Sequence, residues 1–315
     1  MELQKDTATY KKGVFAGAFT GLTWGMHSVL TSLVMVMGGF IEPGYAFFVA
    51  PLVASFLNYI FSTIWFSGYA IARGKVKSSF AALKTKSGRA LVLASLFGGP
   101  IGFGLFYISI HFIGAGFASS ISALFPILTG VFSYFLLKEK LKLKNWLGVI
   151  ISIAAIAFLW FAPDDVGNEN FILGVVFAFG SAIAWALETV IIAWGMKDDD
   201  IGSEEALFIR NGVALVAYAF VIIPIIGGLG MTMDVLTSYV GLYLAGIALI
   251  GTISYAVYYK VIDMIGPSKA SVINITYAGW AVVFGLIFGD GTEFSLILAA
   301  CIALIIFGTS LASKK

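Results

Sequence analysis

An acidic side chain lies in the middle of one of the most apolar stretches of the chain. Glu188 interrupts the run from Phe171 to Met196, which is long enough to cross a membrane. A charge at the centre of a bilayer costs roughly 2.5 to 3.5 kcal/mol on insertion scales. Trp185 precedes Glu188 by three positions, so the two side chains share one helix face. This pair is the first candidate for a polar site within the membrane.

Further aromatic residues lie in other apolar stretches. Tyr255, Tyr258 and Tyr259 are clustered in SYAVYYK, and Trp24 lies in FTGLTWG. Single Trp and Tyr residues are common at membrane interfaces as anchors. Tyr259, next to Lys260, fits that role better than Tyr255 does.

Asn274, Tyr277 and Trp280 recur every three positions in NITYAGW, which predicts one face of a single helix. An acid surrounded by Trp and Tyr indicates a site for an organic cation, because each desolvated ring face attracts positive charge by about 0.5 to 2 kcal/mol. A quaternary ammonium group has no N–H donors, so a cage of rings leaves none of its hydrogen bonds unmet. A bare ammonium group would need several acceptors there.

Other polar residues allow more than one interpretation. Glu188 is either a ligand for a cation or a satisfied polar contact between helices. His27 is either a hydrogen-bonding group in helix packing or a proton carrier, and Glu188 is the second candidate for carrying a proton. Arg210 is expected to extend its charged end to the cytoplasmic face. Ser203 is expected to cap the helix that follows the acidic segment KDDDIGSEE.

Composition defines the broad class. The chain of 315 residues is 60% hydrophobic and 11% charged, with a mean hydropathy of +0.98, whereas soluble domains are about 25% charged. We therefore predict an all-α membrane protein. The net charge of +2 favours no nucleic-acid partner, and the single cysteine, Cys301, excludes an intramolecular disulfide. The N-terminus lacks the pattern of a signal peptide.

Apolar runs of about 18 residues or more predict spanning helices, and ten such runs are present. They lie at about 13–36, 46–72, 89–110, 114–137, 145–162, 171–195, 205–227, 238–260, 267–288 and 294–312. Pro126 and Pro224 are expected to kink the fourth and seventh helices, and Gly99-Pro100 to break the third. All 19 Lys and Arg residues then fall on one side, so the positive-inside rule places both termini in the cytoplasm.

Two short stretches recur in the same order. GVFAGAFTGLTWGMH (13–27) aligns with GVVFAFGSAIAWALE (174–188), which places Trp24 on Trp185 and His27 on Glu188. IGAGFASSISALF (113–125) aligns with IGPSKASVINITY (265–277). We therefore predict a five-helix repeat at 1–165 and a second at 166–315. Because five is odd, the second repeat is inverted, an arrangement typical of secondary transporters with a midplane substrate site.

Motifs for other chemistry are missing from the sequence. It contains no GxxxxGK[ST], HExxH or CxxC, so we expect no cofactor, no metal site and no catalytic residues. An intramembrane enzyme would need a second buried cluster of acids. A channel would need more polar residues along one helix face than the first or sixth helix has.

Ten helices in two inverted halves, with FLLKEKL (135–141) ending the fourth, resemble the drug/metabolite transporter superfamily of the EamA type. More specific stretches, among them FTGLTWG, GGPIG, AIAWALE, ISYAVYY and PSKASVINITYAGW, resemble the bacterial choline importers of the Lic type. That resemblance implies a multi-pass protein of the bacterial inner membrane. It also implies that Trp24, Trp185 and Glu188, with Tyr255 or Tyr258, hold a trimethylammonium group. His27 has no place in the family pattern.

Together these observations predict a secondary transporter that imports choline or a related quaternary ammonium compound by alternating access, with proton coupling through Glu188 or His27 as an option. The alternative is an exporter of amino acids, cationic metabolites or drugs. The expected partners are a small cation, protons and the lipid bilayer. The predicted substrate-binding residues are Trp24, Trp185, Glu188, Tyr255, Tyr258, Asn274 and Tyr277.

Overall fold

A computed structural model describes residues 7–41, 47–136, 142–158, 169–195, 201–265, 267–289 and 295–312, and every regular element in these ranges is helical. The first half contains α1 (Thr7–Val34), α2 (Val49–Ala72), α3 (Val76–Ala82), α4 (Lys86–Leu96), the π-helical segment η2 (Phe97–Phe103), α5 (Gly104–Ser122), α6 (Phe125–Leu136) and α7 (Leu143–Phe158). A short 3-10 helix, η1 (Gly38–Ile41), follows α1.

The second half begins with α8 (Glu169–Gly195). It continues with α9 (Ser203–Ala217), the π-helical segment η4 (Tyr218–Ile222), α10 (Ile223–Ile226), α11 (Leu229–Leu236), α12 (Tyr239–Ile265), α13 (Pro267–Asn274), α14 (Tyr277–Phe288) and α15 (Leu296–Ala312). The prediction of an all-α protein is confirmed for the described residues.

Five of the described helical segments are long and apolar enough to span a membrane. They are Val49–Ala72, Lys86–Ser122, Asn170–Ile192, Ser203–Ile226 and Tyr239–Ile262. Three shorter apolar helices lie at Phe125–Phe135, Tyr277–Phe288 and Leu296–Gly308. A membrane protein is thus supported, whereas the full set of ten spans and the inverted repeat stay predictions.

The third and fourth predicted spans have different boundaries from those expected. The helical path runs through Gly99-Pro100 without a break, because the segment around Pro100 is π-helical, a form that recurs at functional sites. The backbone instead leaves the helical region at Gly114, where φ is 71° and ψ is 166°. A positive φ of this kind is readily adopted only by glycine.

One of the two predicted proline kinks is also placed differently. Pro126 is the second residue of α6, where a backbone N–H would have no helical acceptor in any case, so it begins a helix rather than bending one. Pro224 lies directly after η4, inside the continuous helical path Ser203–Ile226. A kink at Pro224 stays a prediction.

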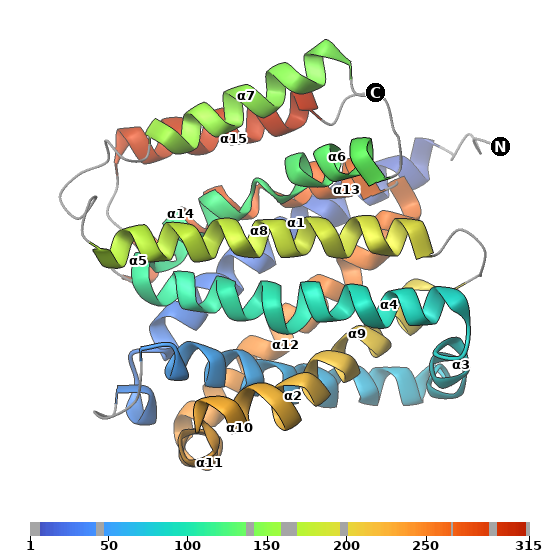
Figure 1. Cartoon of the computed structure of the whole chain (residues 1–315), viewed down its shortest axis with the longest axis vertical. Coiled ribbons are helices and arrows are strands. Elements are labelled where there is room, and N and C mark those ends of the chain that lie inside the picture. Colours follow the sequence, from blue (N-terminus) through green and yellow to red (C-terminus); the bar gives the residue numbers. More distant parts are fainter. Residues whose placement is uncertain are drawn as a thin grey trace.

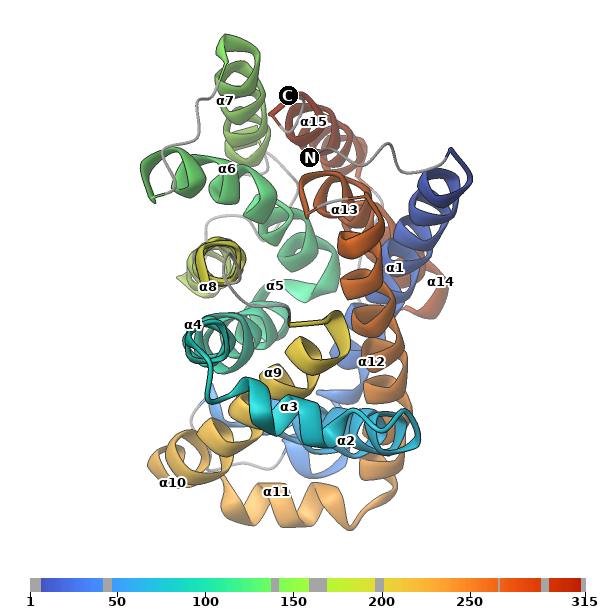
Figure 2. The ribbon, with the colours of Figure 1, turned by 90° about the vertical axis from the view of Figure 1, so that its right-hand side faces the viewer.

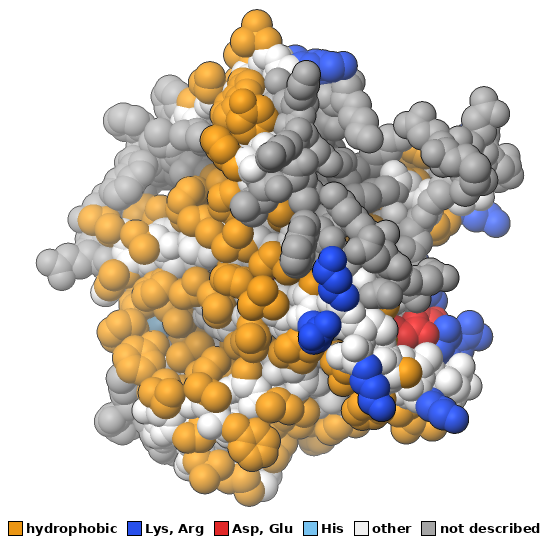
Figure 3. All heavy atoms as spheres, turned by 45° about the vertical axis from the view of Figure 1, so that its right-hand side comes forward, with side chains coloured by type: hydrophobic (Ala, Val, Ile, Leu, Met, Phe, Trp, Pro, Cys, Tyr) orange, Lys and Arg blue, Asp and Glu red, His pale blue; other side chains and the backbone are white. Residues whose placement is uncertain are grey.

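Three helix pairs organise the molecule. α1 packs along α12, α5 packs along α8, and α7 lies beside α15 at one edge (Figures 1 and 2). Apolar side chains cover much of the left and lower parts of Figure 3, and most of the Lys and Arg side chains seen there lie on the right. Among the exposed apolar residues are Phe15, Phe220, Ile225 and Leu242. An apolar surface of this extent suits contact with lipid.

Candidate functional site

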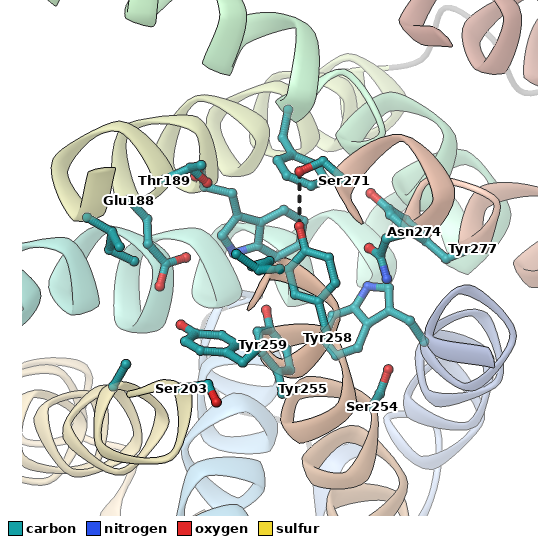
Figure 4. A pocket seen from close by; sticks show the side chains of 16 residues that line it. Glu188, Thr189, Ser203, Ser254, Tyr255, Tyr258, Tyr259, Ser271, Asn274 and Tyr277 are labelled. Atoms are coloured by element: carbon teal, nitrogen blue, oxygen red, sulfur yellow. Dashed lines mark hydrogen bonds between the residues drawn. The ribbon is translucent and has the colours of Figure 1, made fainter. Parts of the chain in front are cut away.

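A cavity of about 270 Å³ lies among α1, α6, α8, α9, α12, α13 and α14 (Figure 4). All seven residues predicted to bind substrate line it: Trp24, Trp185, Glu188, Tyr255, Tyr258, Asn274 and Tyr277. They come from five helices that are far apart in the sequence. Their role in binding stays a prediction, but they share one enclosed space.

Aromatic rings form one side of the cavity. Trp24 meets Trp185 edge to face with ring centroids 6.5 Å apart, and it meets Tyr255 in the same manner at 5.1 Å. Phe103 packs behind all three rings at 5.5 to 6.0 Å. Edge-to-face pairs of this kind are favourable and hold each ring in place.

Glu188 is bound by an arginine rather than left alone. Arg210 Nε donates a hydrogen bond to Glu188 Oε1 at 2.7 Å, and only 1% of Arg210 is exposed. The expectation that Arg210 reaches the cytoplasmic face is therefore wrong. It lies two turns inside α9, where burying its charge requires a partner of opposite sign.

Three more acceptors surround the Arg210 guanidinium. Nη1 donates to the hydroxyl of Tyr59 at 3.1 Å, and Nη2 donates to the carbonyl of Gly98 at 2.9 Å and the hydroxyl of Tyr255 at 3.4 Å. The guanidinium carbon also lies 4.5 Å from the centroid of the Tyr255 ring. Arg210 is thus an internal cation, fixed behind the aromatic side of the cavity and absent from its lining.

The structure contains the satisfied contact between helices that was one of the two interpretations of Glu188: its Oε1 joins α8 to α9 through Arg210. The carboxylate also points into the cavity in Figure 4, and Glu188 belongs to the lining. Binding of a cation by Glu188, whose charge Arg210 partly compensates, stays a prediction.

The opposite side of the cavity is rich in hydroxyl and amide groups that are held by neighbours. The hydroxyl of Tyr258 lies 3.0 Å from Ser271 Oγ, and that of Tyr277 lies 2.9 Å from Ser122 Oγ. Asn274 Nδ2 donates to Thr20 Oγ1 at 3.0 Å. The lining therefore combines aromatic rings, one acid and neutral polar groups.

One further residue joins the lining, and two expectations about residues near the cavity need correction. Tyr259, whose place beside Lys260 favoured an interface anchor, also lines the cavity. Trp280 lies outside the lining and is 36% exposed, because a turn at Ile275 and Thr276 separates α13 from α14 and changes the face on which it lies. Ser203 is the first residue of α9, and Gly202 occupies the cap position.

His27 lies outside the main cavity. Its ring stacks on Trp24 with centroids 4.8 Å apart, and its Nε2 is 3.2 Å from Asn58 Oδ1. It lines a second, much smaller cavity of about 10 Å³, to which Trp24 and Tyr255 also contribute. The two candidate proton carriers thus have different surroundings.

A helical membrane protein that encloses a cavity of this kind has the form of a small-molecule transporter. Comparison with known families agrees: the chain belongs to the EamA-like transporter family, whose sequence model matches residues 11–161 and again residues 172–314. EamA-like proteins are membrane transporters of the drug/metabolite superfamily and not enzymes.

The individual proteins that the chain resembles match only part of its length or share little sequence identity with it. The chain is 30% identical over 195 residues to Protein LicB of Haemophilus influenzae, a match that covers 61% of this chain and 64% of LicB. It is 35% identical over 88 residues to the uncharacterized transporter YvbV of Bacillus subtilis, covering 28% of each protein. A crystal structure with 16% sequence identity superposes with a TM-score of 0.60 over 96% of both chains, which supports the fold.

Proposed function

We propose that this protein imports choline or a related quaternary ammonium compound across the bacterial inner membrane by alternating access. The observation that carries the proposal is the cavity that the rings of Trp24, Trp185 and Tyr255 line together with Glu188. A quaternary head group gains from ring faces and from a nearby negative charge, and it requires no hydrogen bonds. The resemblance to Lic-type importers supports the same class of substrate.

The ion pair between Arg210 and Glu188 bears on which cations the cavity would favour. Because Arg210 compensates part of the Glu188 charge, the rings must supply much of the affinity. A cage that depends on rings favours large, weakly hydrated cations over small, strongly hydrated ones. It therefore favours trimethylammonium over a primary ammonium group.

The packing of the helices supports transport by two related halves. The sequence repeat places α1 on α8. The second aligned pair places the part of α5 after Gly114 on α13, and hence the part before Gly114 on the end of α12. The packed pairs α1–α12 and α5–α8 are exchanged by that correspondence. We propose that residues 1–165 and 166–315 form the two inverted repeats, with ten spans in all and both termini in the cytoplasm. The site lies where the two halves meet, as in other transporters of this design.

Calorimetry on the purified protein tests the substrate class. We expect choline to bind more tightly than ethanolamine, although choline is larger, and betaine and carnitine to bind more weakly because their carboxylates meet Glu188. Uptake of radiolabelled choline into liposomes tests transport. Tighter binding of ethanolamine or of a zwitterionic amino acid would instead favour an exporter of amino acids, cationic metabolites or drugs.

A further inference from the structure

The ring of Trp24 lines the cavity and also stacks on His27. The imidazole stacks on the indole with an angle of 11° between the ring planes, and the His27 side chain is completely buried. Nε2 faces Asn58 Oδ1, an oxygen that only accepts hydrogen bonds, so Nε2 carries the hydrogen in this contact. In the neutral ring, Nδ1 then has the lone pair.

This Nδ1 atom has no hydrogen-bond partner among the described residues. The Tyr107 ring centroid lies 6.4 Å from that of His27, and the Tyr107 hydroxyl interacts with Thr31, one turn further along α1. Buried polar groups are almost always hydrogen-bonded. Nδ1 is therefore a buried basic nitrogen whose lone pair has no donor among the described residues.

The charges around His27 are unlike those around Glu188. The lining of the small cavity at His27 includes Arg210 and, among the described residues, no carboxylate. Arg210 itself is bound to Glu188. The other titratable groups on the packed helices are Tyr59 on α2, Tyr107 on α5, Tyr255 on α12 and Tyr277 on α14. A proton on His27 would thus add an uncompensated positive charge directly behind the aromatic cage.

We propose that His27 is a proton-binding site coupled to the cation cage through Trp24, so that a proton on His27 and a cation in the cavity oppose each other. This inference rests on the proposed function, because it requires that the cavity takes a cation. The imidazolium and the substrate would both draw on the electrons of one indole ring and would repel each other. Two charges within roughly 10 Å, at an effective dielectric constant of about 20, change a binding constant about ten-fold. Linkage requires that the cation weakens proton binding by the same factor.

Glu188 is poorly suited to this role. Protonating its carboxylate would leave the buried guanidinium of Arg210 without its counter-charge, which is strongly unfavourable. His27 can change charge without breaking an ion pair. The structure thus separates the two candidate proton carriers.

Calorimetric titration of the purified full chain with tetramethylammonium tests the coupling. Wild-type protein should bind more weakly as the pH falls, by up to about ten-fold once His27 is fully protonated, and binding should release protons over the same pH range, measured in buffers of different ionisation enthalpy. His27→Gln should keep tight binding across that pH range. His111→Gln, at the exposed and only other histidine, is the matched control and should behave as wild type. Glu188→Gln should bind more weakly but keep the pH dependence.

The outcomes separate the two proposals. Wild-type binding that is independent of pH, or a pH dependence that survives in His27→Gln and disappears in Glu188→Gln, would overturn the role of His27. Absence of tetramethylammonium binding at every pH would contradict the proposed function instead. In that case, NMR of ¹⁵N-histidine in the His111→Gln protein still decides: a His27 ring that keeps one protonation state from about pH 4.5 to about pH 8.5 overturns the proton site.

Discussion

Gly98 lies directly against Glu188, so close that a Cβ atom at this position would overlap the carboxylate. The carbonyl of the same glycine accepts hydrogen bonds from Trp185 Nε1 at 3.1 Å and from Arg210 Nη2 at 2.9 Å. Gly102, four residues further along η2, lies against Trp185. A Cβ atom added at Gly102 would lie 2.7 Å from the Trp185 ring. The π-helical segment η2 therefore positions the indole, the carboxylate and the guanidinium together.

Gly98→Ala should disturb the position of Glu188 although it adds only one methyl group. The added methyl group must displace Glu188 or the backbone of η2, and overpacking of this kind costs about 1 to 3 kcal/mol. We expect weaker choline binding in calorimetry and a lower unfolding temperature. Gly68→Ala is the matched control, because Gly68 is exposed in the helical region of α2 with nothing within 4 Å of an added Cβ. Unchanged choline affinity in Gly98→Ala would mean that the carboxylate does not need this position.

Removing one partner of the buried ion pair should be worse than removing both. Arg210→Met leaves the Glu188 carboxylate uncompensated, a change that typically costs about 3 to 5 kcal/mol. Glu188→Gln combined with Arg210→Met removes both charges and should recover much of that stability. Thermal unfolding of the single and double variants in one detergent measures the coupling.

An ion pair near the surface provides the control for this cycle. Lys75 Nζ lies 3.0 Å from Glu205 Oε1, and its side chain is 39% exposed. Lys75→Met should shift the unfolding temperature only slightly, because water screens such pairs. An equal effect of Lys75→Met and Arg210→Met would argue that Arg210 is not a buried counter-charge.

The two tryptophans should each contribute to cation binding. We expect Trp24→Ala and Trp185→Ala to weaken choline binding by about 1 to 3 kcal/mol, and the Phe variants to weaken it less because a smaller ring face remains. Trp65→Ala is the control, since Trp65 is 41% exposed on α2 and lies outside the cavity lining. Unchanged choline affinity in both alanine variants would remove the aromatic cage from the proposal.

The sequence predicted the aromatic cavity because it follows from local spacing. Trp185 and Glu188 lie three positions apart on one helix, and the repeat then pointed to Trp24. Each of these inferences needs only which residues share a helix face. In the structure these residues line one cavity. Tyr259 lines it as well, although its position beside Lys260 favoured an anchor at the membrane interface.

Arg210 could not be found in this way. It lies on the next helix, and periodicity does not say which faces of α8 and α9 meet. A signal was present, because a buried acid needs a partner, and Arg210 is a basic residue in the following apolar run. The effect of the helix-breaking Gly and Pro residues could not be read from the sequence either. Gly and Pro residues mark a local change, but whether Pro100 ends a helix or shifts it to π-helical geometry depends on what packs against it.

Cysteine labelling tests the orientation of the helices. In a Cys301→Ala background, we expect Lys77→Cys to react with a membrane-impermeant maleimide only in inside-out vesicles, and Asp234→Cys only in right-side-out vesicles. Both positions are exposed, and Cys301 is buried. The reason is the positive-inside rule, which places the basic segment around α3 in the cytoplasm. Labelling of both positions from the same side would contradict the predicted topology.

The neutral polar groups of the cavity should distinguish choline from a cation without a hydroxyl group. Asn274 is held in place by its hydrogen bond to Thr20 and lines the cavity, so its amide oxygen can accept a hydrogen bond from the choline hydroxyl. Asn274→Leu should weaken choline binding by about 0.5 to 1.5 kcal/mol, the usual contribution of one hydrogen bond, and leave tetramethylammonium binding unchanged. Asn274→Asp should strengthen the binding of both cations, because it adds a negative charge. Calorimetry with the two ligands on each variant gives the comparison. Equal losses for both ligands in Asn274→Leu would show that Asn274 shapes the cavity without reading the hydroxyl group.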